Sequence, residues 1–212
     1  PMWILKDADS TVYLFGSIHM MKPDVPWFSG DVKTAFKKAH TVTFEVDMDD
    51  LDPAEVQRMM MQNSRLPEGE TLSDFLSEST MAELMKVFES AGVPRDRVET
   101  LRPWFAALQF GQLAAMQAGF SPQFGIDKVL TDRAKSAGKE IEGMETFKEQ
   151  IELLMMIDEL AGNGAFEAQM EQYEDAKVLF EKMKTRWMAG DTEGLVALLL
   201  APSEEMAPKF HE

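Results

Sequence analysis

The amino-acid sequence predicts a helix-rich α/β (α+β) fold, in which a central mixed sheet begins with a βαβ unit and is interrupted by a large helical insertion. Strand, helix and strand patterns follow one another between residues 11 and 48, and helical patterns dominate from about residue 50 to residue 120. No repeat, low-complexity tract or Pro/Ser-rich linker divides the 212 residues. We therefore expect one domain spanning residues 1–212.

The first three elements are predicted to bring two strand ends together. Residues 11–15, TVYLF, form a short apolar run closed by Gly16, as in a buried strand. Residues 31–39 carry apolar side chains at helical spacing, and residues 41–48 alternate between an aliphatic face and a polar face that includes Glu45. Two strands joined by one helix are usually parallel neighbours. We therefore expect Gly16 and Glu45 to lie at the same edge of the sheet.

Beyond residue 50 the sequence carries repeated helix signals. Asp52 followed by Pro53 supplies an N-cap and a first-turn proline. A capping box formed by Thr146 and Glu149 opens a later helix, after a short strand and loop at 139–145. Further helices are predicted over residues 80–92, 103–119, 125–138, 166–188 and 191–201.

Composition excludes several classes of function. The formal net charge is −16, from 37 acidic and 21 basic residues, which disfavours nucleic acid and anionic membrane surfaces. We interpret this charge as a solvated acidic surface. The sequence has no cysteine, which excludes disulfides, thiolate nucleophiles and cysteine-ligated metal sites. No run approaches the roughly 18 apolar residues of a membrane helix. Because the chain begins at Pro1, we expect a signal sequence or lipid anchor upstream.

The candidate chemistry lies at the predicted strand ends. The sequence contains no dinucleotide-binding, P-loop, zincin or nucleophile-elbow motif. It does place Gly-Ser-Ile-His after the first strand, and Glu45 in the second. An imidazole and a carboxylate at adjacent strand ends can begin a metal site, although a lone His19 can equally be a structural hydrogen-bonding residue. His40 precedes the second strand and is expected at the opposite edge of the sheet.

Three further residues are candidates for binding substrate. Arg102 precedes a proline-initiated helix, where its guanidinium could reach a cleft or pair on the surface. Asp127 could bind substrate or help to open its helix. Glu145 follows the third short strand, where it could join the acidic end of the cleft or favour the N-terminus of the next helix.

Six segments, in this order along nearly the whole chain, give the sequence a family resemblance. They are YLFGSIHMMKPD at 13–24, TFEVDM at 43–48, RPW at 102–104, GIDKVL at 125–130, GKEIEGMETFKEQ at 138–150 and WMAGD at 187–191. The sequence is identified as a member of the TraB/PrgY/GumN family, which also includes the animal Tiki proteases. This resemblance implies a fold similar to erythromycin-esterase and ChaN-like proteins, with a central sheet built from two related halves.

The resemblance also implies an activity and a site. Tiki-like members are metal-dependent peptidases that use two G-x-x-H motifs and a strand glutamate, with Mn or Co favoured as the divalent metal and Zn an alternative. The first motif corresponds to Gly16–His19 and the glutamate to Glu45, whereas the second motif has no counterpart here. His19 and Glu45 are thus the expected catalytic residues and metal ligands, and Arg102, Asp127 and Glu145 the expected substrate-binding residues.

Further expectations follow from the missing second motif. The 212 residues are expected to lack C-terminal strands, to hold no catalytic metal tightly, and to expose a sheet edge through which a homodimer could form. We expect a bacterial periplasmic or extracytoplasmic protein that acts on peptides or proteins. Two alternatives stay open: a non-catalytic module that binds heme or another ligand, and a regulatory protein of polysaccharide or pheromone pathways.

Overall fold

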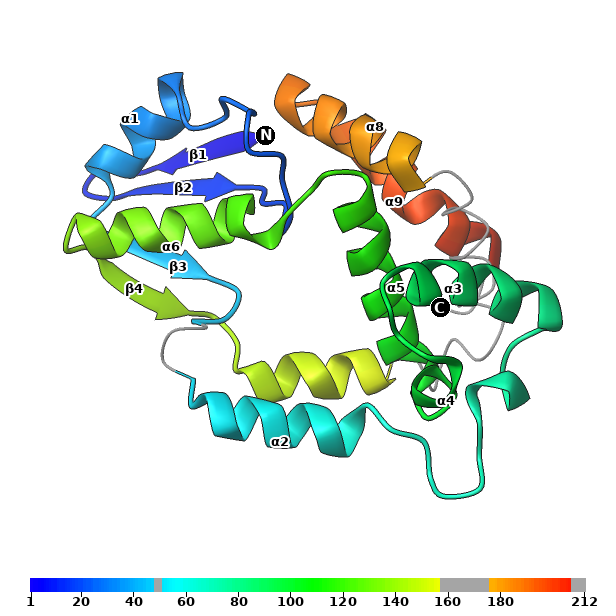
Figure 1. The fold of residues 1–212 in the computed structure, drawn as a ribbon. Helices are drawn as coiled ribbons and strands as arrows, with labels where there is room; N and C mark the ends of the chain where they lie inside the picture. The colour runs from blue at the N-terminus through cyan, green and yellow to red at the C-terminus, as the bar shows by residue number, and fades with distance from the viewer. Residues whose placement is uncertain (48–50, 157–175, 207–212) are drawn as a thin grey trace.

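A computed structural model describes residues 1–47, 51–156 and 176–206 of the chain (Figure 1). Its described residues form helices and two small sheets, which confirms the helix-rich α/β class. One sheet consists of β1 and β2, and the other of β3 and β4. No helix within these residues is long and apolar enough to cross a membrane.

The chain opens with a β-hairpin whose first strand the sequence analysis did not predict. Strands β1 (Met2–Lys6) and β2 (Thr11–Phe15) pair antiparallel, with Trp3 opposite Leu14. The carboxylate of Asp7 closes the connecting turn, since it accepts hydrogen bonds from the Ser10 backbone N–H at 2.7 Å and the Ser10 hydroxyl at 2.9 Å. An Asp-x-x-Ser turn between two apolar runs is the local signal for this hairpin.

The strand–helix–strand order is confirmed, but the expected pairing of its two strands is wrong. Helix α1 (Gly30–Lys38) separates β2 from β3 (Thr41–Phe44), yet β2 pairs with β1, and β3 pairs in parallel with β4 (Glu140–Gly143). The physical reason is that residues 2–6 take one edge of β2 and the other edge stays apart from β3. Strand β2 is also more exposed than a buried strand, with Leu14 at 52%.

Between β3 and α6, the regular elements that the structure describes are helices joined by loops. They include α2 (Pro53–Asn63), α3 (Glu78–Ser90), α4 (Arg95–Val98), α5 (Pro103–Gln117) and a short 3-10 helix at Leu72–Asp74. As predicted, Asp52 caps α2, accepting from the Ala54 N–H at 2.9 Å. Helices α3 and α5 bury an apolar cluster around Phe88 and Leu84, both fully buried.

After the helical region, the chain forms β4 and then helices that pack against the end of β2. Helix α6 (Ile126–Ser136) leads into β4, and a helix over residues 147–156 starts at the predicted Thr146–Glu149 capping box. Helices α8 (Ala176–Ala189) and α9 (Thr192–Met206) follow, so the predicted helix over 166–188 lies partly outside the described residues. Buried Trp187 of α8 packs with Phe15 and Trp27 in a second apolar cluster.

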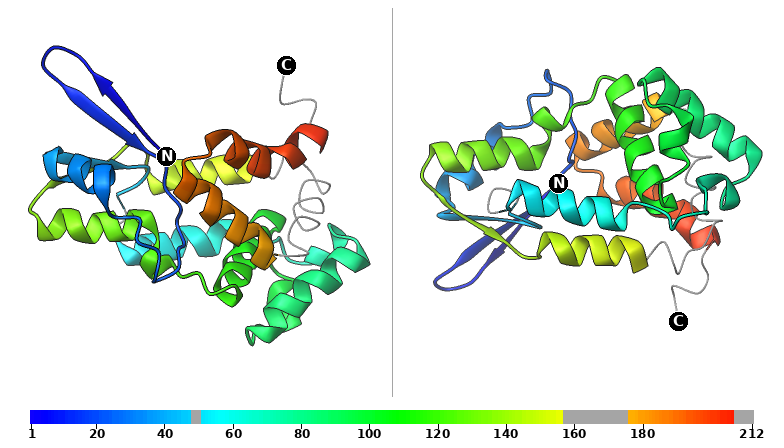
Figure 2. Two further views of the ribbon diagram at one scale, coloured as in Figure 1. Left: turned by 90° about the horizontal axis from the view of Figure 1, so that it is seen from above. Right: turned by 60° about the horizontal axis from the view of Figure 1, so that its bottom comes forward.

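One face of the hairpin is uncovered in the part of the chain that the structure describes. The hairpin projects from the helices in the left view of Figure 2. The register of β1 and β2 places four apolar side chains on one face, and each is about half exposed: Trp3, Leu5, Val12 and Leu14. An apolar face of this kind marks a contact surface more often than a free surface.

Candidate functional site

Backbone hydrogen bonds hold the loop that carries Gly-Ser-Ile-His. Ile18 accepts a bond from the Ile126 N–H at 2.9 Å, and Met21 exchanges two backbone bonds with Ser121. On the other side, the indole Nε1–H of Trp187 donates to the Gly16 carbonyl at 2.7 Å. The loop is therefore fixed between the start of α6 and the C-terminal part of α8, which sets the position of His19.

His19 pairs with Asp127, which stands in the first turn of α6. The Nδ1 atom of His19 lies 2.6 Å from Oδ2 of Asp127, and the Ser17 side chain is close enough to the same carboxylate to lower its pKa. The His19 side chain is 72% exposed and that of Asp127 is 33% exposed. In the neutral imidazole, a proton on Nδ1 would be held by the carboxylate, which would leave the Nε2 lone pair to bind a ligand or accept a proton.

The pair shifts the pKa values of both partners in opposite directions. The hydrogen bond to Asp127 raises the pKa of His19; partial burial opposes the rise, and the negative charges of Asp127 and Glu45 add to it. For Asp127, burial raises the pKa, but the hydrogen bond and positive charge of His19, with the Ser17 hydrogen bond, outweigh it and lower the pKa overall. The pair therefore favours an imidazolium beside a carboxylate.

Glu45 lies immediately after β3 rather than within it. Its carbonyl accepts a hydrogen bond from the Glu145 N–H at 2.8 Å, and its Oε2 lies 3.5 Å from Nε2 of Gln150. Its side chain is exposed, and its charge contributes to the raised pKa of His19. The sequence analysis did not identify Ser17 or Gln150 as site residues. Ser17 lies beside Asp127 and Gln150 beside Glu45, and these contacts depend on the tertiary structure.

The other two candidates lie in different surroundings. Glu145 follows β4 and is exposed, next to Glu45 through the backbone bond. Arg102 is the N-cap residue of α5 in the helical region, where its Nε–H donates to the Arg65 carbonyl at 3.1 Å. That bond ties the guanidinium to the backbone near the end of α2. A substrate-binding role for Arg102 and Glu145 stays a prediction.

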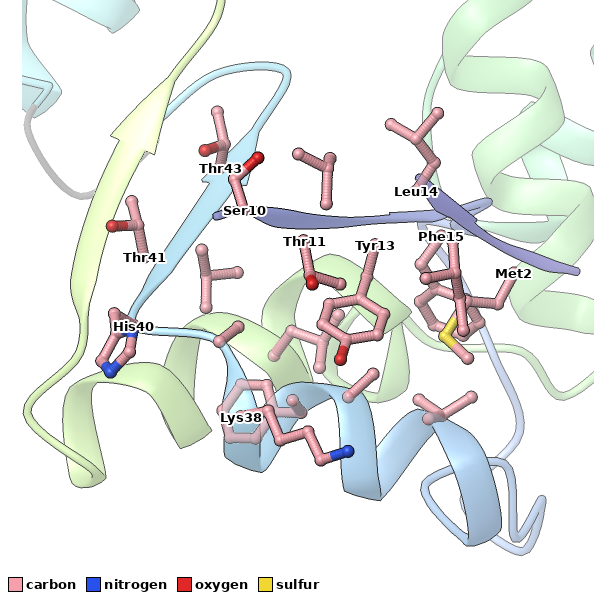
Figure 3. Close-up of a pocket in the computed structure, with 18 of the residues that line it drawn as sticks. Met2, Ser10, Thr11, Tyr13, Leu14, Phe15, Lys38, His40, Thr41 and Thr43 are labelled. Carbon is pink, nitrogen blue, oxygen red and sulfur yellow. The ribbon is translucent and has the colours of Figure 1, made fainter. Parts of the chain in front are cut away.

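A hollow of about 1350 Å³ lies between β2, α1 and β3 (Figure 3). Ser17, Glu45 and Asp127 line it at the carboxyl ends of the two strands, and His40 lines it at the start of β3. We expected His40 to lie away from the cleft, but it borders the same hollow. The reason is that β2 and β3 do not pair, so the space between them runs along the full length of both strands.

The donors in this region do not complete a metal site by themselves. Across residues 1–47, 51–156 and 176–206, no group of three or more His, Cys, Asp or Glu side chains is arranged to hold an ion. A catalytic zinc site has about three protein ligands, with imidazoles commonly oriented by a carboxylate as His19 is by Asp127. Nε2 of His19 and the Glu45 carboxylate are donors of the kind that such positions use, and any further ligand has to come from elsewhere.

Comparison with known proteins identifies the family. The TraB/PrgY/gumN family profile matches residues 1–212. The proteins named Uncharacterized protein YbaP of Escherichia coli (strain K12) and of Shigella flexneri are each 23% identical over 176 residues. This match covers 83% of the chain and 63% of each relative, so the chain spans less than two thirds of their length. No solved structure matches. The chain belongs to the TraB/PrgY/gumN family.

Proposed function

We propose that this domain is part of a metal-dependent hydrolase that cleaves peptides. The observation that carries the proposal is the His19–Asp127 pair, with Nδ1 and Oδ2 2.6 Å apart and Glu45 close enough to shift the pKa of His19. These groups stand at the carboxyl ends of two strands, where ligands of α/β proteins commonly bind. The pair also borders a hollow of about 1350 Å³ through Asp127.

Each residue has a distinct role in the proposal. Asp127 would hold the proton on Nδ1 of His19 and fix the orientation of the ring, which would leave Nε2 available to a divalent ion. Glu45 would supply a second ligand as a carboxylate. The chemistry that a divalent ion would supply there is a lowered pKa of bound water and a polarised carbonyl group, which peptide hydrolysis requires. The Mn or Co preference expected from the family resemblance belongs to this proposal.

The proposal also covers the class of substrate and the cellular compartment of the full-length protein. The net charge of −16 disfavours a polyanionic partner, and the family resemblance is the reason to propose a peptide or protein substrate. We place the full-length protein outside the bacterial cytoplasm. Fractionation of cells that produce the full-length protein would test this, and recovery with cytoplasmic markers would contradict it.

The test of the proposed function measures metal binding and peptide cleavage in separate experiments. Mn²⁺, Co²⁺ and Zn²⁺ are titrated into the full-length protein by calorimetry, and cleavage is followed on a mixed fluorogenic peptide library. His19→Ala and Glu45→Gln should each weaken metal binding by more than the 10- to 100-fold typical of lost supporting contacts, and should abolish cleavage. His40→Ala and Glu142→Gln are the matched controls for metal binding. Unchanged metal affinity in both site variants would overturn the ligand assignment.

A second function, the ligand-binding module, rests on the hollow. A hollow of this size beside the His19–Asp127 pair also suits a module that binds a ligand, such as heme, without chemistry. Hemin added to the protein would then give a shifted Soret band that disappears in His19→Ala. If the protein cleaves peptides and does not bind hemin, and His19→Ala abolishes the cleavage, the result supports the hydrolase over the ligand-binding module.

A further inference from the structure

The segment that follows β4 is attached to the backbone of Glu45. Two hydrogen bonds continue the contact between β3 and β4 beyond the strands. The Met144 N–H donates to the Phe44 carbonyl at 2.9 Å. The Glu145 N–H donates to the Glu45 carbonyl at 2.8 Å. The chain that leads to the next helix therefore begins beside Glu45.

The helix over residues 147–156 starts at a fixed point after this contact. In its capping box, the Thr146 N–H donates to Oε2 of Glu149 at 2.7 Å, and the Glu149 N–H donates to the Thr146 hydroxyl at 3.2 Å. The Gln150 N–H then donates to the Thr146 carbonyl at 3.2 Å, and the next residue, Ile151, is buried with 4% exposure. Gln150 therefore stands in the first turn of the helix, at an end that packs against the protein.

The side-chain amide of Gln150 reaches the carboxylate of Glu45. Its Nε2 lies 3.5 Å from Oε2 of Glu45, which is at the long end of the range for a hydrogen bond. The backbone bond to Glu145 and the capping box at Thr146 hold the two residues at this separation. An amide donates a hydrogen bond without adding a positive charge. The contact can therefore orient the carboxylate and leave its charge intact.

Glu45 differs in this respect from other carboxylates of the chain. Glu181 pairs with two lysines, and Glu99 pairs with Arg95. None of the ion pairs within the described residues includes Glu45. A lysine or arginine in the place of Gln150 would offset the negative charge that attracts a cation. Carboxylates that bind metals are commonly held by hydrogen bonds from groups that do not touch the ion, and Gln150 fits that description.

We propose that Gln150 is a positioning residue that holds the Glu45 carboxylate in a fixed orientation at the candidate site. This inference rests on the proposed function for the role of Glu45 as a metal ligand. Asp127 contacts His19 from α6, and Gln150 contacts Glu45 from the helix over residues 147–156. Each of the two proposed ligands thus has its own polar partner, and the two partners stand on separate helices.

The first experiment measures the contact itself, by NMR on the full-length protein without metal. Gln150→Met keeps an unbranched side chain of similar length but has no donor, so it should shift the carboxyl carbon signal of Glu45. Gln117→Met is the matched control, because Gln117 donates to the Ser90 hydroxyl at 2.6 Å in the helical region. This control should leave the Glu45 signal in place. A Glu45 carboxyl signal that does not move in Gln150→Met overturns the proposal.

The second experiment measures metal affinity, by calorimetric titration of Mn²⁺ into the full-length protein without any peptide. Gln150→Met should weaken binding by about 10- to 100-fold, as the loss of a supporting contact at a metal site does, and Gln117→Met should not weaken it. Glu45→Asp keeps a carboxylate but shortens it beyond the reach of Gln150. If Gln150 acts through Glu45, Gln150→Met should have almost no further effect in Glu45→Asp. Equal fold-changes in both backgrounds would show general damage and overturn the proposal.

The outcomes separate this inference from the proposed function. A shifted Glu45 signal in a protein that binds neither Mn²⁺, Co²⁺ nor Zn²⁺ supports the orientation of Glu45 by Gln150 and contradicts the metal-dependent hydrolase. Metal binding that Glu45→Gln weakens and Gln150→Met leaves unchanged supports the ligand assignment and removes the role of Gln150. Gln150→Ala replaces Gln150→Met in both experiments if circular dichroism shows that the methionine variant does not fold.

Discussion

The backbone carbonyl of His19 packs directly against the α-carbon of Gly125. A β-carbon at residue 125 would overlap the His19 oxygen and lie 2.7 Å from the carbonyl carbon. Gly125 is the N-cap residue of α6, so this contact brings the His19 loop to the helix that carries Asp127. The glycine of Gly-Ile-Asp is therefore a packing requirement of the site.

Gly125→Ala should push the His19 loop away from α6 and separate His19 from Asp127. Inserting a methyl group into such a contact costs about 1–3 kcal/mol of stability, measured by urea unfolding. Gly16→Ala is the control, because a β-carbon there would lie 3.4 Å from Cγ of Pro1, an ordinary contact. Equal stability of the two variants would contradict the close approach.

Asp127→Asn should lower the pKa of His19, because it removes the carboxylate that most strongly raises it. The measurement is an NMR titration of the His19 imidazole in metal-free protein, with Asp132→Asn as a control on the same helix. A His19 pKa that stays raised in Asp127→Asn would mean that the pair does not form in solution.

The same pair gives a pH dependence of stability. The folded pKa of His19 is raised, so its contribution is complete below the unfolded pKa and is lost as the pH rises through the folded pKa. The folded pKa of Asp127 is lowered, so its contribution is present above the unfolded pKa and is lost as the pH falls through the folded pKa. The stability difference between wild type and Asp127→Asn should therefore be largest in weakly acidic solution. Urea unfolding across pH checks this, and a pH-independent difference would count against the ion pair.

Trp187→Phe should loosen the start of the Gly-Ser-Ile-His loop. The indole is 5% exposed and donates to the Gly16 carbonyl at 2.7 Å, and phenylalanine keeps an aromatic ring but loses that donor. We expect a loss of about 1 kcal/mol together with shifted His19 NMR signals. Trp104→Phe, which removes a bond to the Asn63 carbonyl in the helical region, should leave the His19 signals in place. Unchanged His19 signals in Trp187→Phe would show that this bond does not position the loop.

Phe88→Ala and Leu14→Ala should differ sharply in their effect on stability. Phe88 is fully buried in the cluster between α3 and α5, so its truncation should cost about 3–5 kcal/mol. Leu14 lies on the uncovered face of the hairpin at 52% exposure, and its truncation should change stability by about 0.5 kcal/mol or less. A large loss in Leu14→Ala would show that another surface covers this face in solution.

Local signals in the sequence determined the secondary structure and the candidate residues. Capping at Asp52 and at Thr146–Glu149, helix starts at Pro103 and Ile126, and the short strand at 140–143 all follow from residues within one or two turns of each other. The family resemblance rests on segments of the same kind and is confirmed over residues 1–212.

Tertiary structure alone decided which of these elements meet. The pairing of β2 with β1, the approach of Asp127 to His19 across 108 positions, and the hollow between β2, α1 and β3 depend on contacts between distant segments. A strand pattern shows which side chains share a face, but both edges of a strand carry the same backbone groups. For that reason the sequence could place His19 and Glu45 at strand ends, whereas only the packing of α6 and α8 around the loop shows what His19 touches.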